Sequence, residues 1–121
     1  MLYRRAAEQG KAAAQFNYAL MLASGQGVQQ NEEAAGRWLR RAAESGDARA
    51  QYELGRLCAS GGTGGDPIEA HVWFGLAEAG AESGIADRAR TARAALAPRL
   101  DADALREAER RLRERIGGGG Q

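Results

Sequence analysis

The stretch RRAAEQGKAAAQF at Arg4–Phe16 is nearly restated, 36 residues further on, by RRAAESGDARAQY at Arg40–Tyr52. Self-similarity at such a period is the signature of an array of like structural units. The composition agrees, because the chain has only 2 prolines and 6% aromatic residues and is rich in alanine, the strongest helix former. The repeated stretch therefore predicts an all-α protein built from stacked helical units.

Each unit is predicted to hold two helices joined by a glycine-rich turn. The first helix of the first unit spans about Lys11–Ser24, with small or apolar residues at helical spacing, and Gly25 provides its left-handed cap. Asn31 is the expected N-cap of the second helix, whose buried stripe includes Trp38, and Asp47 can cap the helix that follows. The second unit repeats this plan at a spacing of 36 and, after a one-residue deletion in its turn, of 35.

Two pairs of equivalent residues indicate how the helices pack. Ala19 and Gly55 lie where two helices are expected to cross at short range, because a larger side chain would force the axes apart. Trp38 and Trp73 are expected to fill the space between neighbouring units. The pattern thus places small and large side chains at fixed positions of each unit.

The pattern A-x-A-Q-x-x-[LY]-[GA]-x-x-x-x-S-G-x-G, followed by A-x-x-W-[LF] and A-A-E-x-G, resembles the Sel-1-like repeat family, a branch of the tetratricopeptide-like (TPR-like) helical repeats. The resemblance covers about Leu2–Ala86. It implies an α/α right-handed superhelix, or solenoid, in which the first helices of successive units line a concave surface.

The ends of the chain are less regular than its middle. Residues 85–97 and 102–116 are predicted helices that lack the repeat signatures, and Pro98 separates them. Asp101 is the expected N-cap of the last helix. The expected organisation is a truncated repeat at 1–10, repeats at 11–46 and 47–81, a degenerate capping helix pair at 82–116, and a flexible glycine tail at 117–121.

The charge is close to balanced overall but uneven along the chain. Residues 85–116 hold nine arginines and six acidic residues (+3), whereas residues 1–84 hold eight basic and ten acidic residues (−2). No aromatic residue follows Phe74, and Glu107/Arg111 and Glu109/Arg113 have the spacing of helical ion pairs. We therefore expect a solvated, salt-bridged face and no nucleic-acid partner. No apolar run is long enough to predict a membrane span.

The residues that could carry chemistry have structural interpretations. His71 is the only histidine and has no ligand or acid/base partner at a suitable spacing, so it is expected to be a packing or surface residue. Cys58 takes the position of Leu22 on the buried stripe. The loop SGGTGGDP at Ser60–Pro67 lacks the lysine of a phosphate loop. No catalytic residue, metal or cofactor is predicted.

The first helices differ between units along one stripe, and the resemblance implies that this stripe faces the concave groove. Mixed aromatic, amide and charged groups suit the recognition of a peptide or protein. The alternative interpretation is that these are ordinary exposed helix residues. The candidate partner-binding residues are Asn17, Leu20, Arg49, Tyr52, Glu53 and Arg56.

The favoured function is a non-enzymatic scaffold or adaptor that binds a partner protein or peptide. The alternative is a structural or regulatory spacer within a larger envelope-associated protein, and an enzyme is the third and weakest interpretation. Leu2 and Tyr3 form an apolar edge that self-association or an upstream segment is expected to cover. The start LYRRAAEQG has no apolar core and predicts no signal peptide, so we expect a cytoplasmic protein, or a periplasmic one if an upstream segment precedes it.

Overall fold

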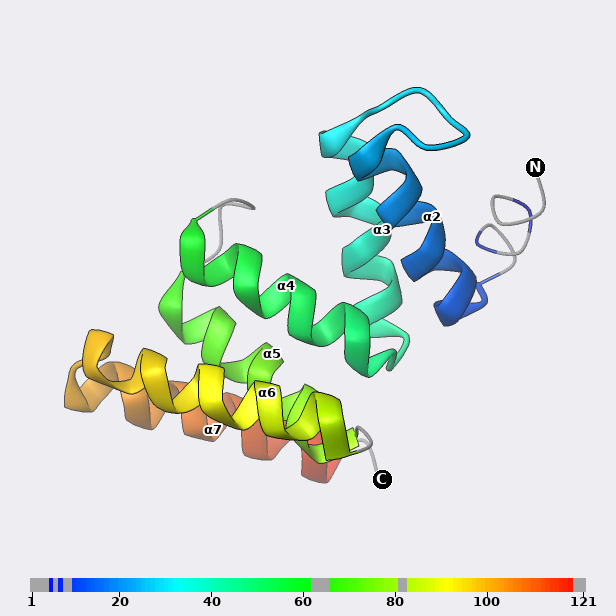
Figure 1. The fold of residues 1–121 in the computed structure, drawn as a ribbon. Coiled ribbons are helices and arrows are strands. Elements are labelled where there is room, and N and C mark those ends of the chain that lie inside the picture. The colour runs from blue at the N-terminus through cyan, green and yellow to red at the C-terminus, as the bar shows by residue number, and fades with distance from the viewer. Residues whose placement is uncertain (1–4, 6, 8–9, 62–65, 81–82, 119–121) are drawn as a thin grey trace.

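The structure, a computed structural model, describes residues 5, 7, 10–61, 66–80 and 83–118. Within these residues α2 and α3 form one hairpin, α4 and α5 form a second that crosses it steeply, and α6 and α7 follow (Figure 1). The predicted all-α repeat architecture is confirmed. The elements are α2 (Ala12–Ser24), α3 (Glu32–Glu44), α4 (Ala48–Ser60), α5 (Pro67–Gly80), α6 (Ser83–Leu96), the short 3₁₀ helix η1 (Ala97–Arg99) and α7 (Ala102–Gly118).

Side-chain caps start the helices where the sequence places them. Asn31, Asp47 and Asp101 each accept a hydrogen bond from the backbone N–H three residues ahead, at 3.0, 3.1 and 2.7 Å. Gly25 and Gly61 end α2 and α4 in the left-handed region, with φ of 78° and 80°, which a side chain would disfavour. Local chemistry therefore sets the length of each hairpin helix.

A buried glutamine ties each unit to the helix before it. The side-chain amide of Gln51 in α4 donates to the backbone carbonyl of Ala43 in α3, at 3.1 Å. Gln15 in α2 makes the equivalent bond to the carbonyl of Ala7, at 3.2 Å. Both glutamines are at least nine-tenths buried, so these bonds satisfy polar groups that water does not reach. The glutamine of the repeated A-x-A-Q motif therefore makes a hydrogen bond between units.

The core lies where α4 and α5 pack together. Leu54, Cys58 and Trp73 are almost completely buried there. Gly55 allows the close approach predicted for it, because a Cβ on this residue would lie 2.7 Å from the ring of Phe74. Cys58 is therefore a core side chain, as its equivalence to a repeat-one leucine predicts.

The two tryptophans differ in a way that the repeat pattern does not predict. Trp73 is buried, and its indole N–H donates to Glu69 at 3.3 Å. Trp38 is only half-buried and meets Tyr18 of its own hairpin edge-to-face, with ring centroids 5.4 Å apart. The guanidinium of Arg41 lies 4.6 Å from its ring centroid. Trp38 also packs against the hydrophobic core, whose members come from both hairpins, and its expected place between units stays a prediction.

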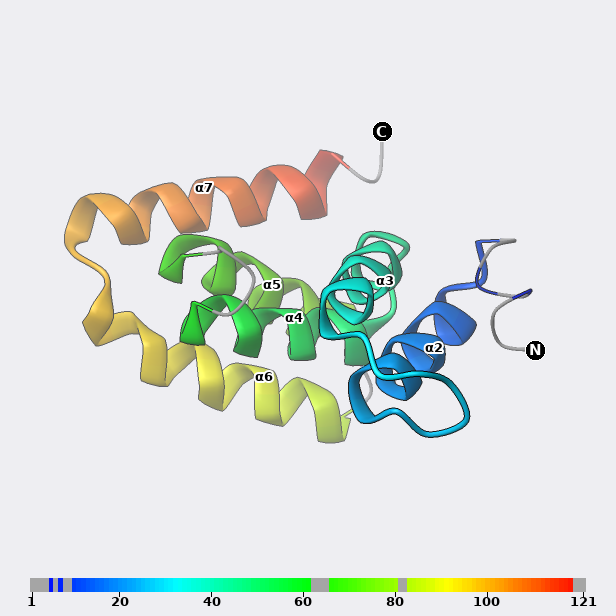
Figure 2. The ribbon, with the colours of Figure 1, turned by 90° about the horizontal axis from the view of Figure 1, so that it is seen from above.

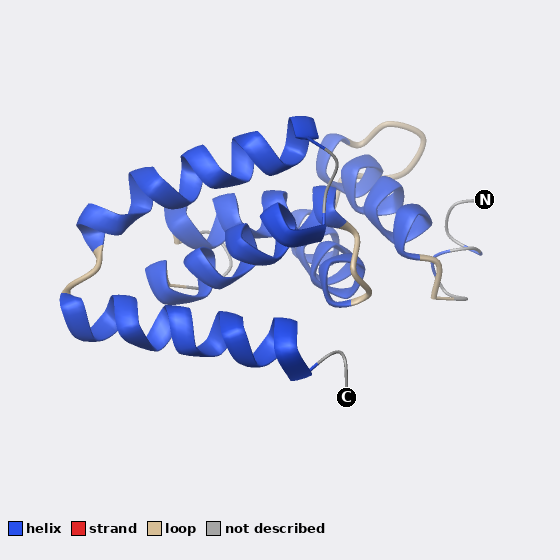
Figure 3. Ribbon diagram, turned by 90° about the horizontal axis from the view of Figure 1, so that it is seen from below, coloured by secondary structure: helices blue, strands red, loops and turns tan. Residues whose placement is uncertain are grey.

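The last two helices do not form a third hairpin of the same kind. Helix α6 packs on α5 and also reaches α4, whereas α7 packs chiefly on α5 instead of on α6. Figures 2 and 3 show α6 and α7 on opposite sides of the α4–α5 pair. Pro98 lies in η1 and breaks the helix there, which lets the chain cross to the other side. The capping pair therefore clamps α5 between its two helices.

Two of the predicted boundaries shift at this end. Helix α6 is two residues longer at its start than expected, and α7 continues through Gly117 and Gly118, which the sequence places in a flexible tail. Glycine is permitted in the last turn of a helix, where the cost of ordering it is small. No helix within the described ranges is long and apolar enough to cross a membrane.

Candidate functional site

A cleft of about 640 Å³ opens between the two hairpins. The hairpins meet through α3 and α4, so α2 and α4 form facing walls and α3 forms the floor. The lining is mostly apolar and contains several small side chains, with charged groups at its margins. The described lining residues are Ala19, Leu20 and Ala23 of α2; Glu32, Glu33, Ala35, Gly36, Arg37, Leu39 and Arg40 of α3; and Glu53 and Leu57 of α4.

A second, shallower hollow of about 540 Å³ lies on the other side of α2. Asn17, Met21 and Gln26 are among its lining residues, and Leu20 and Ala23 line both hollows. Leu20 is 47% exposed, whereas most large apolar side chains of the described chain are covered. Leu20 therefore stands as an exposed ridge between two depressions.

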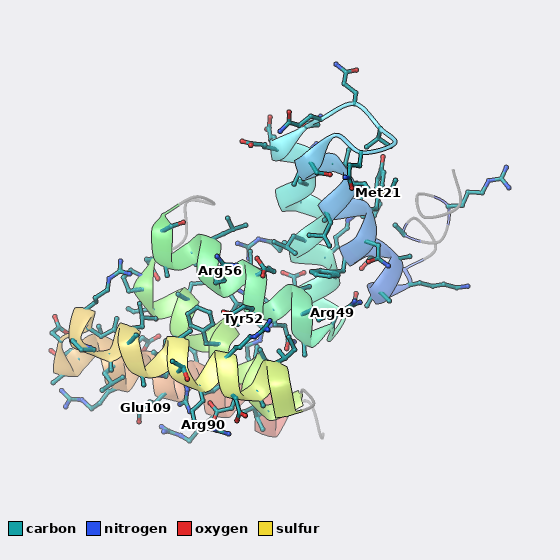
Figure 4. The ribbon with its side chains drawn as sticks, viewed as in Figure 1. Met21, Arg49, Tyr52, Arg56, Arg90 and Glu109 are labelled. Atoms are coloured by element: carbon teal, nitrogen blue, oxygen red, sulfur yellow. The ribbon has the colours of Figure 1, made fainter. Side chains whose placement is uncertain are left out.

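The structure distributes the six predicted site residues over α2 and α4. Leu20 and Glu53 come from different hairpins and line the same cleft, and Asn17 lines the adjoining hollow. Figure 4 shows Arg49, Tyr52 and Arg56 along α4. Four of the six residues thus lie on one helix, and the cleft joins that helix to α2.

Contacts within the chain engage the four residues of α4. Arg56 pairs with Glu53 at 3.2 Å, and its guanidinium lies 5.9 Å from the ring centroid of Tyr52. The ring of Tyr52 is tilted against Phe74 at 5.8 Å, so this tyrosine also supports the packing of α4 on α5. Arg49 covers the ring of Phe16 at 4.5 Å and bridges the two hairpins. Arg56 is the most exposed of these four side chains.

Most charges around the cleft already have a partner. Arg40 binds Glu69 of α5 at 2.9 Å, and Glu33 and Arg37 lie 3.5 Å apart on α3. Glu53 is held by Arg56, as described above. Among the described residues, Glu32 has no ion-pair partner. The lining groups together with their partners therefore leave one uncompensated negative charge.

The contribution of α3 to this cleft is the part that sequence reasoning missed. The repeat pattern assigns recognition to first helices, yet the floor belongs to a second helix, with Gly36 near its middle. A Cβ on Gly36 would meet nothing within 4 Å, so packing does not explain this glycine. Glycine in a helix interior costs roughly 0.5–1 kcal/mol relative to alanine, and that unexplained cost is a signal that could have pointed to the floor.

His71 lies at the junction of α5, α6 and α7, away from the cleft. Its side chain is 3% exposed, and its Nδ1 has no hydrogen-bond partner among the described residues. Burial lowers the pKa of His71, and the charge of Arg93 on α6 lowers it further, while Glu109 and Glu78 act in the opposite direction. His71 is therefore a packing residue that favours the neutral form. Among the described residues, no group of three or more acidic, histidine or cysteine side chains is placed to hold a metal.

Ion pairs cover much of the arginine-rich surface of α6 and α7. Arg111 binds Glu107 at 2.6 Å as predicted, and Arg110 bridges Glu107 and Glu114. The expected pair of Glu109 with Arg113 is wrong, since no such contact occurs between these two described side chains. The negative charge of Glu109 instead raises the pKa of His71 in α5, which partly opposes the lowering by burial and Arg93. The loop at residues 60–67 and the edge at Leu2 and Tyr3 fall wholly or partly outside the described residues.

Crossed helical hairpins, tied together by an equivalent glutamine in each unit, define an α/α repeat solenoid. The chain belongs to the Sel1 repeat family, whose model matches residues 1–11, 12–47 and 48–80. Sel1 repeat proteins generally act as protein-interaction scaffolds, and the repeat is a non-enzymatic fold.

Two solved structures show the same arrangement. One is a protective antigen present in uropathogenic Escherichia coli strains that displays an SLR fold, with 34% identity over 95% of this chain and a TM-score of 0.83. The other is a Sel1 repeat protein from Oxalobacter formigenes, with 37% identity over 75% of this chain and a TM-score of 0.68. The chain spans 24% and 36% of these two proteins. A comparison with curated proteins finds no match.

Proposed function

We propose that this chain is an adaptor without catalytic activity, which binds a partner protein or peptide on the face formed by α2 and α4. The family resemblance supports this choice, since it implies that first helices line the concave side of the solenoid. The observation that carries the proposal is the shared cleft, which Leu20 of one hairpin and Glu53 of the next both line and whose surface as a whole is mostly apolar. A surface shared by two repeats can contact a longer segment of a partner than the surface of one repeat can.

The exposed residues of this face suit protein recognition. Leu20 offers apolar area that the chain leaves open to solvent, and Arg56 offers a charged group near Tyr52. Binding sites of this kind combine a few apolar anchors with a polar rim. Rigid helices hold these side chains in place, so the mechanism is presentation of a preformed surface and involves no chemical step.

A selection from a random peptide library displayed on phage tests the proposal. Peptides enriched on the wild-type protein are measured against Arg56→Glu and against Arg106→Glu, a matched charge reversal on α7. We expect Arg56→Glu to change the affinity by at least about fivefold, equivalent to about 1 kcal/mol, in the direction set by the charge of the selected peptide, and Arg106→Glu to leave it unchanged. Failure to enrich any peptide, or equal effects of both substitutions, would reject binding on this face.

A further inference from the structure

Resting on the proposed function, we infer that the occupant of the cleft between α2, α3 and α4 is a cationic amphipathic helix whose apolar side chains straddle Leu20. Three features of the cleft support this inference: its shape around Leu20, the chemistry of its lining and its residual charge. The shape indicates where the partner's apolar side chains lie, the lining indicates its backbone conformation, and the charge indicates the sign of its polar side chains.

The shape of the surface fits side chains that interlock with Leu20. This residue separates the cleft from the hollow that Asn17 and Met21 line. In helix packing, side chains of one helix insert into the depressions beside the side chains of another. A partner helix with two aliphatic residues a turn apart can place one of them in each depression and cover Leu20 between them. Ala23 and Gly36 are small enough to let its backbone come close.

The chemistry of the lining favours a helix over an extended peptide. The described lining residues of the cleft include no amide or hydroxyl side chain. Two of its charged groups, Arg40 and Glu53, are already engaged by Glu69 and Arg56. An extended peptide brings unpaired backbone N–H and C=O groups, and the apolar part of the lining, which Leu20, Leu39 and Leu57 contribute to, offers them no partner. A helix satisfies these groups internally, so it can enter an apolar cleft with little polar cost.

The charge of the cleft favours lysine or arginine beside the aliphatic residues. Glu32 is uncompensated, and the side chain of its neighbour Glu33 is 87% exposed with only a 3.5 Å contact to Arg37. The charged lining residues are three glutamates and two arginines, which leaves a net charge of −1 on the lining. Complementary charge raises the rate of encounter and discriminates against acidic competitors. Glu32 and Glu33 begin α3, so the basic groups are placed at that end of the cleft.

Three synthetic helical peptides test this inference on the intact chain. They share one framework of leucine and alanine and carry lysine, glutamine or glutamate at their polar positions. Fluorescence anisotropy measures their affinity for the wild-type protein at low and high salt. We expect the lysine peptide to bind most tightly and the glutamate peptide most weakly, with the difference shrinking as salt is added.

Substitutions that leave the fold intact locate the site. Leu20→Ala should weaken binding of the lysine peptide by about tenfold, because the anchor is truncated. Ile116→Ala truncates the other large exposed aliphatic side chain of the described residues and should leave binding unchanged. Gly36→Leu should also block binding, because its side chain projects into the cleft. Gly84→Leu on α6 is its matched control, since a Cβ there likewise meets nothing within 4 Å.

A charge reversal separates the electrostatic part. Glu32→Lys should reduce the preference for the lysine peptide over the glutamate peptide by about fivefold. Equal binding of all three peptides, absence of binding, or insensitivity to both Leu20→Ala and Gly36→Leu would overturn the inference. If library peptides still respond to Arg56→Glu in that case, the proposed function stands and only the nature of its partner is wrong.

Discussion

Leu112 of α7 occupies the space where a side chain on Gly75 of α5 would stand. A Cβ built on Gly75 would overlap the terminal carbons of Leu112, and α7 packs chiefly on α5 at this place. The absence of a side chain therefore lets the last helix dock. Gly75 thus allows α7 to pack closely on α5, as Gly55 allows α4 and α5 to approach each other closely.

Gly75→Ala should accordingly leave the protein about 1–3 kcal/mol less stable than a helical Gly→Ala change at an open site, because Leu112 must shift to admit the Cβ. Gly36→Ala is the matched control, because its Cβ enters open space and should stabilise the helix by roughly 0.5–1 kcal/mol. Chemical denaturation followed by circular dichroism measures both changes. A smaller cost of Gly75→Ala in a Leu112→Ala background than in the wild type would assign the loss to this contact; equal stability of the two single variants would contradict it.

The glutamine bond between units should matter because it is buried. Gln51→Ala removes this bond, while the carbonyl of Ala43 still accepts from the backbone N–H of Gly46 at 3.1 Å, and should lower the free energy of unfolding by about 1–1.5 kcal/mol. Gln30→Ala removes a bond of the same kind to the carbonyl of Ala23, but at an exposed site, and should cost no more than about 0.5 kcal/mol. Thermal unfolding of both variants provides the comparison, and similar losses would argue against a special role for the repeated glutamine.

Stability should depend on pH through His71. The unfolded chain takes up a proton near the ordinary pKa of 6.5, whereas burial and Arg93 lower the pKa of His71 in the folded state. The contribution of His71 is therefore complete above pH 6.5 and declines as the pH falls toward the lowered folded pKa. Melting temperatures measured from pH 7.5 to 5.5 should fall for the wild type and change less for His71→Gln. A steeper dependence in the variant would refute this assignment.

The two tryptophans should respond differently to a soluble quencher. Trp73 is 2% exposed and lies under Arg115, whose guanidinium is 4.7 Å from its ring centroid, while Trp38 is half-buried. Trp38→Phe leaves the emission of Trp73, which acrylamide should quench weakly; Trp73→Phe leaves that of Trp38, which should be quenched severalfold more. Stronger quenching of Trp73 than of Trp38 would contradict the packing of α7 over Trp73.

Local patterns predict the hairpins well. Asn31 and Asp47 cap their helices by accepting hydrogen bonds from N–H groups three residues ahead. Because these bonds are local, the residues nearby in the sequence are sufficient to predict the caps. The repeat register also predicts Gly55, because its equivalent in the first unit is alanine. In such cases the physical cause and its sequence signal lie within one unit.

Contacts that depend on tertiary placement are not readable in this way. Nothing near Gly75 in the sequence indicates that Leu112 will fill its place, since α7 first crosses to the far side of the α4–α5 pair. The same holds for the floor of the cleft. Gly36 lies there because the two hairpins cross, and the angle at which they cross cannot be predicted from the sequence of either hairpin alone. The half-buried position of Trp38 likewise follows from the neighbours that α3 meets, and its equivalence to Trp73 does not predict it.

Mapping by ¹H–¹⁵N NMR tests the central claim, that the chain binds through the cleft between α2 and α4. The lysine peptide is titrated into labelled protein, and backbone amide shifts are followed residue by residue. The account predicts that the largest changes fall on Ala23, Gly36 and Leu57, one residue from each helix that lines the cleft. Changes confined to α6 and α7, or spread evenly over the chain, would contradict it.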